Sequence, residues 1–427
     1  MNIRTTIGIG AGKITRSGLR LLGKNAGALP GLVSEKLAPG ILADALGALP
    51  DGVIIITGTN GKTTTTKIIT DLLEANGKRV LTNRMGSNFT RGVVSVIVSE
   101  SELGKPLPHD IAVLELDEAY AKKFVQVCKP RYVVALNVMR DQLDRFGEID
   151  TTARFIASAM QAATDGVIVN ADDHRLVRAA EEAGLNTIYF GVDPKLAKHF
   201  PGDDDLLAVD QDNKPKNDAE TTTSHKPLVT LKNFKGQSVT YAFGKQSVVV
   251  DMRLTGQYNF QNGAAALALL TTLLPDITPE TLTGQMSHVL PAFGRGEVVE
   301  IDGERIELIL IKNPSGFRLA LASFHDPATA LIAINDNDPD GRDISWLWDV
   351  DFTSLSKSEV ATTGLRAYDM ALRLQYDEIP VAWSEPDLAK AVTKLLQHKT
   401  KVPKRIFCNY TAMLAIRSHF GKELHEV

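Results

Sequence analysis

The sequence predicts an α/β protein with a central P-loop ATPase domain and a smaller C-terminal α/β domain of the Rossmann-like type. Apolar, β-branched runs alternate with amphipathic stretches from Val53 to about Leu290, and the alternation resumes beyond residue 296. The first of these runs ends in a glycine-bracketed Gly-Lys-Thr loop, which is typical of a nucleotide site. We therefore expect an N-terminal helical segment, a central domain and a C-terminal domain at 1–50, 51–295 and 296–427.

The composition is that of an ordinary globular protein. The 427 residues are 44% apolar and 23% charged, which suffices for two or three cores. A net charge of −4 argues against general nucleic-acid binding. The two cysteines, Cys128 and Cys408, lie far apart and are expected to be buried thiols in a reducing compartment. No apolar run is long enough for a bilayer and no secretory signal is recognisable, so we expect a cytoplasmic protein.

The first 50 residues predict a basic amphipathic helix, because Lys13, Arg16 and Arg20 alternate with apolar residues. The Gly8–Gly12 run imitates a nucleotide loop, but too few residues precede it to form a strand. A basic amphipathic helix fits an anionic membrane surface, or packing on the protein body with its charged face in solvent. The second arrangement is the commoner one, and the sequence leaves both open.

The stretch from Ile54 to Thr66 predicts a strand, a phosphate-binding loop and the start of a helix. Backbone N–H groups at a helix start attract phosphate, a lysine reaches the terminal phosphates, and a threonine hydroxyl completes a Mg²⁺ shell. The loop departs from the common G-x-x-x-x-G-K-[ST] pattern because Ile56 replaces the first glycine. A strand-to-helix turn that merely contains a lysine is the alternative. We expect an ATP or GTP site formed by Gly58, Thr59, Asn60, Gly61, Lys62, Thr63 and Thr64.

Polar side chains also follow two further predicted strands. The run from Ile111 ends at Glu115, and a carboxylate beside the phosphate loop would bind Mg²⁺ as a hard oxygen ligand. An acidic strand end that faces water is the alternative. The run Tyr132–Asn137 leads into the charged segment 140–147, and open α/β sheets bind ligands at this carboxyl edge.

The stretch from about Lys195 to Val250 is polar and rich in turn residues, which predicts an insertion with a hairpin and a mobile tip. The helix that follows places Asn259 near its start, where an amide could contact an adenine edge. This signal is weak by itself.

The C-terminal unit predicts a second α/β domain of about 130 residues, an ordinary domain size. Between Asn335 and Phe352, two of the three tryptophans lie among six aspartates. A solvated loop does not need two tryptophans, so this stretch is expected to face a partner or a substrate. Strands are expected at 308–311, 330–334 and 405–407, and helices at 317–324, 365–374, 388–396 and 412–419.

Several of these motifs together resemble the Mur ligase family, whose members activate a carboxylate with ATP as an acyl phosphate. The resemblance runs from about residue 5 to the end. Its central part rests on Gly58–Thr64, Val113–Glu115, Asn137–Arg145, Asn259–Ala265 and Gly294–Arg295. The C-terminal motifs resemble one branch of the family, the ligase subunits of lipid II isoglutaminyl synthases. These motifs are Lys312–Phe317, Ile334–Asn337, Asp340–Asp349 and Gly364–Asp369.

The resemblance implies a reaction and a role for each site residue. The α-carboxylate of D-glutamate in the lipid II stem peptide would be phosphorylated by ATP, and ammonia would then displace phosphate to give D-isoglutamine. Lys62 would contact the β/γ-phosphates, with Thr63 and Glu115 around Mg²⁺. Asn259 would contact adenine, and Arg295 would steady the transferring phosphate. About fifty residues before the loop are too few for the uridine-nucleotide domain of full Mur ligases, which agrees with a lipid-linked substrate.

The resemblance also implies a protein partner. The sequence offers no convincing cysteine–histidine pair for releasing ammonia from glutamine, so a glutaminase subunit resembling GatD, a class I glutamine amidotransferase, is expected. Asp349, directly after Trp346-Leu347-Trp348, would orient the partner's catalytic histidine. A helix cap or a surface carboxylate is the alternative role for Asp349. A lipid II substrate would bring the chain to the inner face of the membrane.

Two departures from the family pattern limit the metals that we expect. Ligase subunits of this branch commonly carry a four-cysteine zinc ribbon in the central domain, whereas residues 195–250 contain no cysteine, so no zinc is expected. Many Mur ligases use a carbamylated lysine to help bind Mg²⁺, but no lysine lies between Lys129 and Lys195. A second metal is therefore not implied.

Two other functions remain alternatives. One is a stand-alone Mur or folylpolyglutamate-type ligase that adds an amino acid, and the missing N-terminal domain and lysine argue against it. The other is a scaffold that binds ATP without catalysis, which the presence of Lys62, Thr63 and Glu115 disfavours.

Overall fold

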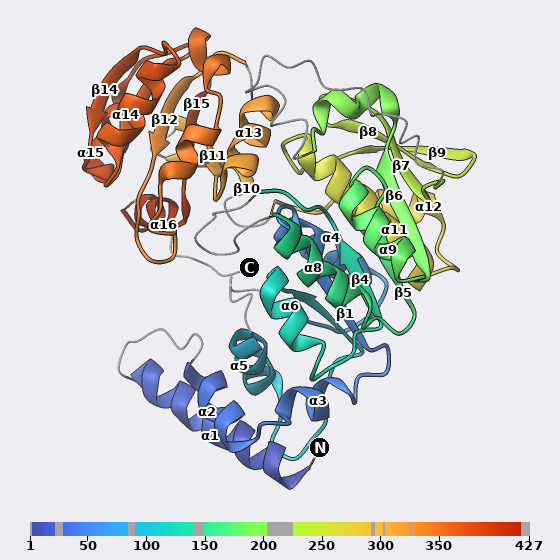
Figure 1. Cartoon of the computed structure of the whole chain (residues 1–427). Coiled ribbons are helices and arrows are strands. Elements are labelled where there is room, and N and C mark those ends of the chain that lie inside the picture. Colours follow the sequence, from blue (N-terminus) through green and yellow to red (C-terminus); the bar gives the residue numbers. More distant parts are fainter. Residues whose placement is uncertain are drawn as a thin grey trace.

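The computed structural model describes residues 2–21, 29–83, 90–140, 149–202, 225–291, 295–301, 304–324 and 326–419. Two sheets, each covered by helices on both faces, form two separate layered bodies, and a group of N-terminal helices lies at the opposite end from the C-terminal sheet (Figure 1). The structure confirms the predicted α/β class, with a larger central sheet and a smaller C-terminal one. The central sheet falls within the predicted central domain, and the C-terminal sheet begins at Arg295, one residue before the predicted C-terminal domain. The domain boundaries themselves stay predictions.

The central sheet has nine strands in the order β2-β3-β1-β4-β5-β6-β7-β8-β9, and it is parallel from β2 to β7. β1 and β3 are buried along their whole length, which explains why their sequences are uniformly apolar rather than alternating until the glutamate that ends β3. The strands are β1 (Val53–Thr57), β2 (Val80–Thr82), β3 (Ile111–Glu115), β4 (Tyr132–Ala135), β5 (Gly166–Asn170), β6 (Thr187–Val192), β7 (Val229–Lys235), β8 (Ser238–Phe243) and β9 (Gln246–Asp251).

Two cores hold helices against the two faces of this sheet. The first core involves α3 (Ile41–Leu46), α5 (Thr90–Glu100), α6 (Glu118–Phe124), α8 (Ile149–Met160) and α9 (His174–Glu182). The second involves α4 (Lys62–Ala75), α11 (Tyr258–Leu273) and α12 (Pro279–Met286). Because helices cover both faces, only the strand ends are accessible, and the carboxyl edge becomes the natural place for a ligand.

The polar stretch that predicted an insertion contributes strands to the central sheet rather than a separate unit. After the short helix η1 (Pro194–His199), β7 pairs in parallel with β6, and β8 and β9 follow as antiparallel neighbours. The inward side chains of Val229, Leu231 and Tyr241 join the core beneath α11, which is why these strands stay attached. The predicted mobile tip falls at 203–224, outside the described residues.

The C-terminal sheet has six strands in the order β10-β11-β15-β12-β13-β14, all parallel except β10. The strands are β10 (Arg295–Ile301), β11 (Glu304–Leu310), β12 (Thr329–Ala333), β13 (Glu359–Thr363), β14 (Val381–Glu385) and β15 (Lys404–Cys408). One face packs on α13 (Pro314–Ser323), η2 (Ser345–Asp349), η3 (Thr353–Lys357) and α14 (Ala367–Tyr376). The other face packs on α15 (Leu388–Gln397) and α16 (Tyr410–His419). The four predicted helices and three predicted strands are confirmed.

The N-terminal segment forms α1 (Ile3–Leu21) and α2 (Leu29–Leu37), which lie side by side beneath α5 (Figure 1). The Gly8–Gly12 run is part of α1, which confirms that it is not a nucleotide loop. In the part of the chain that the structure describes, no helix combines the length and hydropathy needed to cross a bilayer. Cys128 and Cys408 are both buried free thiols, as expected.

Candidate active site

The loop after β1 has the backbone shape that a phosphate site needs. Gly58 and Gly61 adopt positive φ angles of 132° and 89°, which only glycine tolerates easily. A Cβ atom at Gly61 would come within 2.3 Å of the Asn262 Oδ1 atom on α11. The next residue, Lys62, starts α4, so the N–H groups of the first helical turn face the loop.

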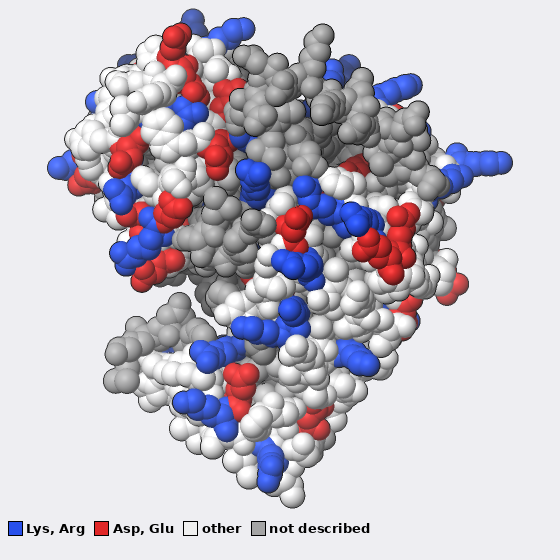
Figure 2. All heavy atoms as spheres, viewed as in Figure 1, with Lys and Arg blue, Asp and Glu red and all other residues white. Residues whose placement is uncertain are grey.

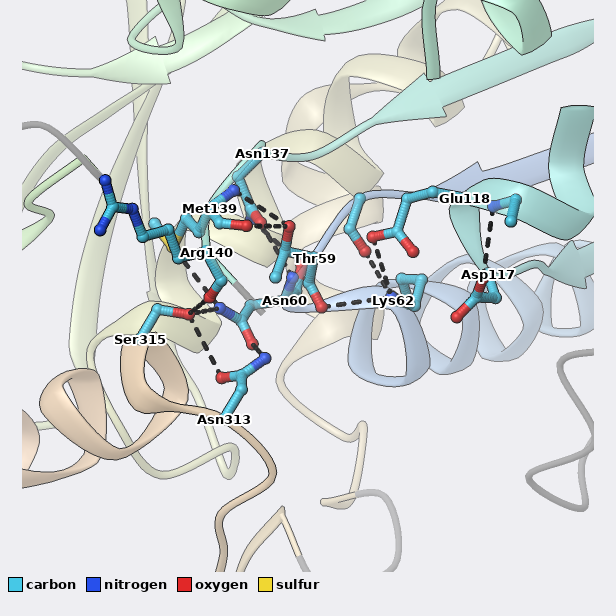
Figure 3. Close-up of polar contacts among 12 residues, drawn as sticks. Thr59, Asn60, Lys62, Asp117, Glu118, Asn137, Met139, Arg140, Asn313 and Ser315 are labelled. Carbon is cyan, nitrogen blue, oxygen red and sulfur yellow. Dashed lines mark hydrogen bonds and ion pairs between the residues drawn. The ribbon is translucent and has the colours of Figure 1, made fainter. Parts of the chain in front are cut away.

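The segment after β4 fixes this loop from the side. The Asn60 N–H group donates to Asn137 Oδ1 at 2.8 Å, and Asn137 Nδ2 donates to the Asn60 carbonyl at 3.1 Å. The Thr59 hydroxyl donates to the Met139 carbonyl and accepts from the Met139 N–H group (Figure 3). These bonds cross from β1 to its neighbour β4, where the strand order changes direction, which is the usual ligand position in such sheets.

Lys62 is folded back over its own loop. Its ammonium group donates to the Gly58 carbonyl at 2.5 Å and to the Thr59 carbonyl at 3.2 Å. It also lies 3.5 Å from a carboxylate oxygen of Glu118 (Figure 3). The ammonium is thus held near the mouth of the loop.

Three carboxylates lie at the end of β3, next to this lysine. Glu115 is buried, and its backbone is held by Asn83 through hydrogen bonds at 2.9 and 2.7 Å. Asp117 caps α6 by accepting from the Ala119 N–H group. Glu118 is only 2% exposed, and its second carboxylate oxygen has no hydrogen-bond partner among the described residues. A buried oxygen of this kind is costly unless a cation or a water ligand satisfies it.

A cavity of about 450 Å³ opens in front of the loop and is closed on the far side by the C-terminal domain. Its walls include Glu115 and Asp117 from the central sheet and Lys312, Asn313 and Asn409 from the C-terminal sheet. The two domains touch directly: Asn60 Nδ2 donates to Ser315 Oγ at 2.9 Å, and Asn313 Nδ2 to Asn60 Oδ1 at 3.4 Å (Figure 3). Atoms from both domains therefore surround one site.

Sequence reasoning missed a pair of aspartates on the wall of this cavity. Asp172 and Asp173 follow β5, and Asp173 Oδ2 accepts from the Val138 N–H group at 2.6 Å. Burial raises the pKa of Asp173, and loss of water contact raises the pKa of Asp172 to about 6, with the charge of Asp173 adding to the effect. The carboxyl-edge rule would have found both residues had it been applied to β5 as well as to β3 and β4.

The structure does not place every predicted residue in the cavity. Gly58 and Thr63 belong to the loop but are not among the lining residues, whereas Thr59, Asn60, Gly61, Lys62 and Thr64 are. Asn259 is fully buried, and its amide is engaged by the Thr255 carbonyl and by Asn262. Its neighbours Tyr258, Gln261 and Asn262 face the cavity instead. The side chain of Arg295 and the segment 141–148 lie outside the described part of the chain.

Asp349 lies away from this cavity, at the end of η2, and is exposed. The preceding Trp348 is 50% exposed and meets the ring of Tyr376 edge-on at 4.9 Å. Trp346 is buried in the core of the C-terminal domain. The two tryptophans thus differ: one holds η2 on the domain, and the other presents an aromatic surface beside Asp349.

The residues present fit a nucleoside triphosphate with a divalent cation. The positive-φ glycines and the helix start can cradle phosphate oxygens, and Lys62 supplies a cation within reach. The unpartnered oxygen of Glu118, close to Glu115 in sequence and at the same strand end, marks a place where further positive charge would be stabilising.

Two family models match this chain. The Mur ligase middle domain matches residues 56–270, and the C-terminal domain of MurT ligases matches residues 310–413. The chain therefore belongs to the Mur ligase family. Within that family it belongs to the MurT group: it is 30% identical to the subunit MurT of a lipid II isoglutaminyl synthase (glutamine-hydrolyzing) from Streptococcus pneumoniae strain R6, over 98% of this chain and 97% of that protein. It is 29% identical to the MurT subunit of Staphylococcus aureus strain COL, over 91% of each chain.

Solved structures of the family share the fold at lower identity. A pseudomurein peptide ligase type C from Methanothermus fervidus has a TM-score of 0.66 and 16% identity, over 90% of this chain and 80% of that one. MurF from Thermotoga maritima in complex with ADP has a TM-score of 0.64 and 18% identity, over 92% and 84%. Escherichia coli FolC with DHPP and ADP has a TM-score of 0.61 and 15% identity, over 89% and 91%.

Proposed function

We propose that this chain is the ligase subunit of a two-subunit enzyme that amidates the α-carboxylate of D-glutamate in the lipid II stem peptide. One observation carries the proposal. A phosphate-type loop and the C-terminal domain enclose one cavity, in a chain that aligns over 98% of its length with a lipid II isoglutaminyl synthase subunit. The class of reaction is an ATP-dependent formation of a carbon–nitrogen bond.

The bonds in the proposed reaction balance as follows. A carboxylate oxygen forms a bond to the γ-phosphorus while the bond from that phosphorus to ADP breaks, which gives an acyl phosphate. Ammonia then bonds to the acyl carbon, and the bond from that carbon to the phosphate oxygen breaks, so that phosphate leaves with the bonding electron pair. The nitrogen loses a proton to give the amide. ATP supplies the phosphoryl group, and Mg²⁺ offsets the negative charge that gathers around it.

The residues of this chain would bind ATP and its cation and orient the transferring phosphoryl group. The N–H groups of residues 61–64 would donate to phosphate oxygens, and Lys62 would leave the loop carbonyls for the β/γ-phosphates. Thr63 and Glu115 would hold the cation, and Arg295 would contact the transferring phosphoryl group. For the adenine, the cavity-facing Tyr258 and Gln261 are better placed than the buried Asn259, which would have to break two hydrogen bonds first.

The nitrogen source is proposed to be a separate glutaminase subunit resembling GatD. The relatives are named as subunits of a glutamine-hydrolyzing enzyme. Neither thiol of this chain is a candidate nucleophile, because both are buried and burial raises the pKa of Cys128 to about 11 and that of Cys408 further. Glutamine hydrolysis therefore needs another polypeptide.

The docking position of this subunit is proposed to be the surface around Asp349. Exposed apolar side chains at i, i+4 and i+8 line one side of α14, namely Tyr368, Leu372 and Tyr376. Tyr376 contacts Trp348, so the apolar strip ends beside Asp349. A partner that covers this strip would place its histidine near the carboxylate, which would orient and charge-stabilise the ring.

The test is co-expression with a glutaminase subunit resembling GatD, followed by an assay of phosphate release and a mass measurement of the muropeptide. The proposal requires that phosphate release depends on both lipid II and a nitrogen source, and that the product is an amide. Product mass would reveal an added amino acid if the chain were a stand-alone ligase. A complex that binds ATP but releases no phosphate would instead indicate a scaffold. The expected location is the cytoplasm, at the inner face of the membrane that carries the substrate.

A further inference from the structure

Helix α1 buries mostly small residues, with Ile9 as the large apolar side chain in the core, and it exposes several other large apolar side chains. The buried residues are Thr5, Gly8, Ile9 and Gly12. An added Cβ at Gly8 would be 3.1 Å from the Ser34 carbonyl oxygen on α2 and 2.8 Å from the Cβ of Ala38, just after that helix. One at Gly12 would be 2.9 Å from a methyl group of Val98 on α5. The Ser34 hydroxyl donates to the Gly8 carbonyl at 2.9 Å, which fixes the contact. This face of α1 is therefore the one that holds it to the body.

The opposite face carries four exposed large apolar side chains. Ile3, Ile7, Ile14 and Leu21 are 80%, 58%, 76% and 89% exposed. At 3.6 residues per turn, these positions fall within about 40° of one another, so they form a single stripe along the helix. Leu103, which is 58% exposed, lies 3.6 Å from where a Cβ of Gly10 would be, and it fills the gap between Ile7 and Ile14. The stripe comprises these five side chains.

The charged residues of α1 itself are all basic. Helix α1 contains four basic residues, Arg4, Lys13, Arg16 and Arg20, and no acidic residue, although the whole chain has a net charge of −4. By helical geometry, Arg4 flanks one side of the stripe, and Lys13 and Arg20 the other. Figure 2 shows basic side chains over the region of the N-terminal helices, with acidic side chains among them. Among the described residues near α1, the acidic side chains of Asp44 and Glu102 are both engaged: Asp44 accepts from the Asn2 N–H group, and Glu102 pairs with Lys105 at 2.5 Å.

We propose that this stripe binds an anionic lipid surface, with α1 lying in the plane of the membrane. An apolar face flanked by lysine and arginine is the arrangement that such in-plane helices use, because the apolar side chains enter the headgroup region while the cations meet lipid phosphates. The inference goes beyond the proposed function, since vesicle binding needs neither ATP nor catalysis. It also gives the chain a fixed orientation at the surface where a lipid-linked substrate would be found.

A second copy of the chain is a less suitable occupant. The spacing of the stripe would suit two helices side by side, but Gly10 and Ser17 occupy the intervening seam positions and offer little apolar area. Two such helices would also bring their basic flanks together, which destabilises the pairing.

The experiment measures binding of the full chain to sedimented vesicles without nucleotide. One set of vesicles is phosphatidylcholine, and the other contains roughly one-third phosphatidylglycerol to give a negative surface. We expect the chain to bind the anionic vesicles and to be released by salt. The Ile7→Ser/Ile14→Ser variant should bind roughly tenfold or more weakly, and so should Arg4→Gln/Lys13→Gln/Arg20→Gln. The matched control, Val127→Ser/Val249→Ser, removes two exposed apolar side chains elsewhere and should bind like the parent.

Each contrary result overturns the proposal. These results are absence of binding to anionic vesicles, equal binding to both lipid compositions, or an Ile7→Ser/Ile14→Ser variant that binds like the parent. A concentration-dependent dimer in light scattering that the same variant abolishes would assign the stripe to a second copy. Since the altered side chains are exposed, except for the half-buried Lys13, thermal unfolding of the Ile7→Ser/Ile14→Ser variant should match the parent. Turnover with ammonia on a detergent-dispersed substrate should also be unchanged, which separates a failure of this inference from a failure of the ligase function.

Discussion

The amide of Asn60 and the hydroxyl of Ser315 are 255 residues apart in the sequence and 2.9 Å apart in the structure. Asn60 belongs to the loop after β1, and Ser315 to the first turn of α13. The same hydroxyl lies 3.3 Å from the Arg140 carbonyl, so it contacts the central domain at both Asn60 and Arg140. Within its own domain it lies 3.2 Å from Asn313 Oδ1. The position of the phosphate loop and that of the C-terminal domain are therefore linked by named atoms.

This link predicts the effect of Ser315→Ala. Loss of a hydrogen bond of this kind costs about 1 kcal/mol, so we expect a rise of about fivefold in the KM for ATP, with a smaller change in kcat. The matched control is Ser323→Ala, near the other end of α13 and away from the loop. Steady-state kinetics with ammonia as nitrogen donor measures both constants. An equal loss in the control would show that the helix, not the contact, is responsible.

Asp349→Asn should affect turnover with glutamine differently from turnover with ammonia. The substitution should abolish turnover with glutamine and leave turnover with ammonia within about twofold of the parent, because the carboxylate acts only on the partner's histidine. Asp351→Asn changes a neighbouring exposed carboxylate and should affect neither reaction. Parallel assays with the purified complex give the comparison. Equal loss of both activities in Asp349→Asn would remove it from this role.

Lys62→Ala tests the nucleotide site. We expect turnover with either nitrogen source to fall about 100-fold or more, since a charged donor to the transferring phosphoryl group is lost. Lys67→Ala, one turn further along α4, removes a lysine that is paired with Asp71 on the helix surface and should cost almost nothing. Phosphate release and ATP affinity should be measured together. Full activity of the Lys62→Ala variant would show that phosphoryl transfer does not take place at this loop.

Asp172→Asn tests the raised pKa at the cavity wall. The folded-state pKa of about 6 lies above the ordinary value of 3.8, so the ionised form destabilises the fold at pH above 6, and this effect disappears as the pH falls toward 4. Asparagine can still accept the hydrogen bond from the Val192 N–H group. The variant should therefore gain thermal stability relative to the parent at pH 7.5, and this gain should shrink at pH 5. Asp276→Asn, at an exposed turn, should show no such pH dependence.

Long apolar runs made much of the fold predictable from sequence. Strands β1, β3 and β4 are buried on both faces, so their composition is unambiguous. Strands β13 and β14 were missed because their sequences, Glu-Val-Ala-Thr-Thr and Val-Ala-Trp-Ser-Glu, are short and half polar. Their pairing with β12 and with each other comes from tertiary contacts that a local pattern does not record.

The site was predictable where the chemistry is local. The loop residues and Glu115 follow from strand-end rules, and most of them line the cavity. The hydrogen bond from the Asn60 N–H group to Asn137 could not be predicted in this way, because it depends on β4 lying beside β1, which only the strand order shows. Asn259 was assigned to adenine because it starts a helix, but its side chain points into the protein and Tyr258 and Gln261 face outward instead. A shift of one residue along a helix turns a side chain by about 100°, which sequence alone does not resolve.

The burial of Cys128 and Cys408 has a practical consequence. Because Cys128 is only 8% exposed and Cys408 is fully buried, a maleimide dye should label the native chain only slowly at neutral pH. A cysteine introduced on the surface would then be the single attachment point, without removal of any native residue. Pairs of such positions, one on each sheet, would report by energy transfer whether the distance between the two bodies changes during turnover.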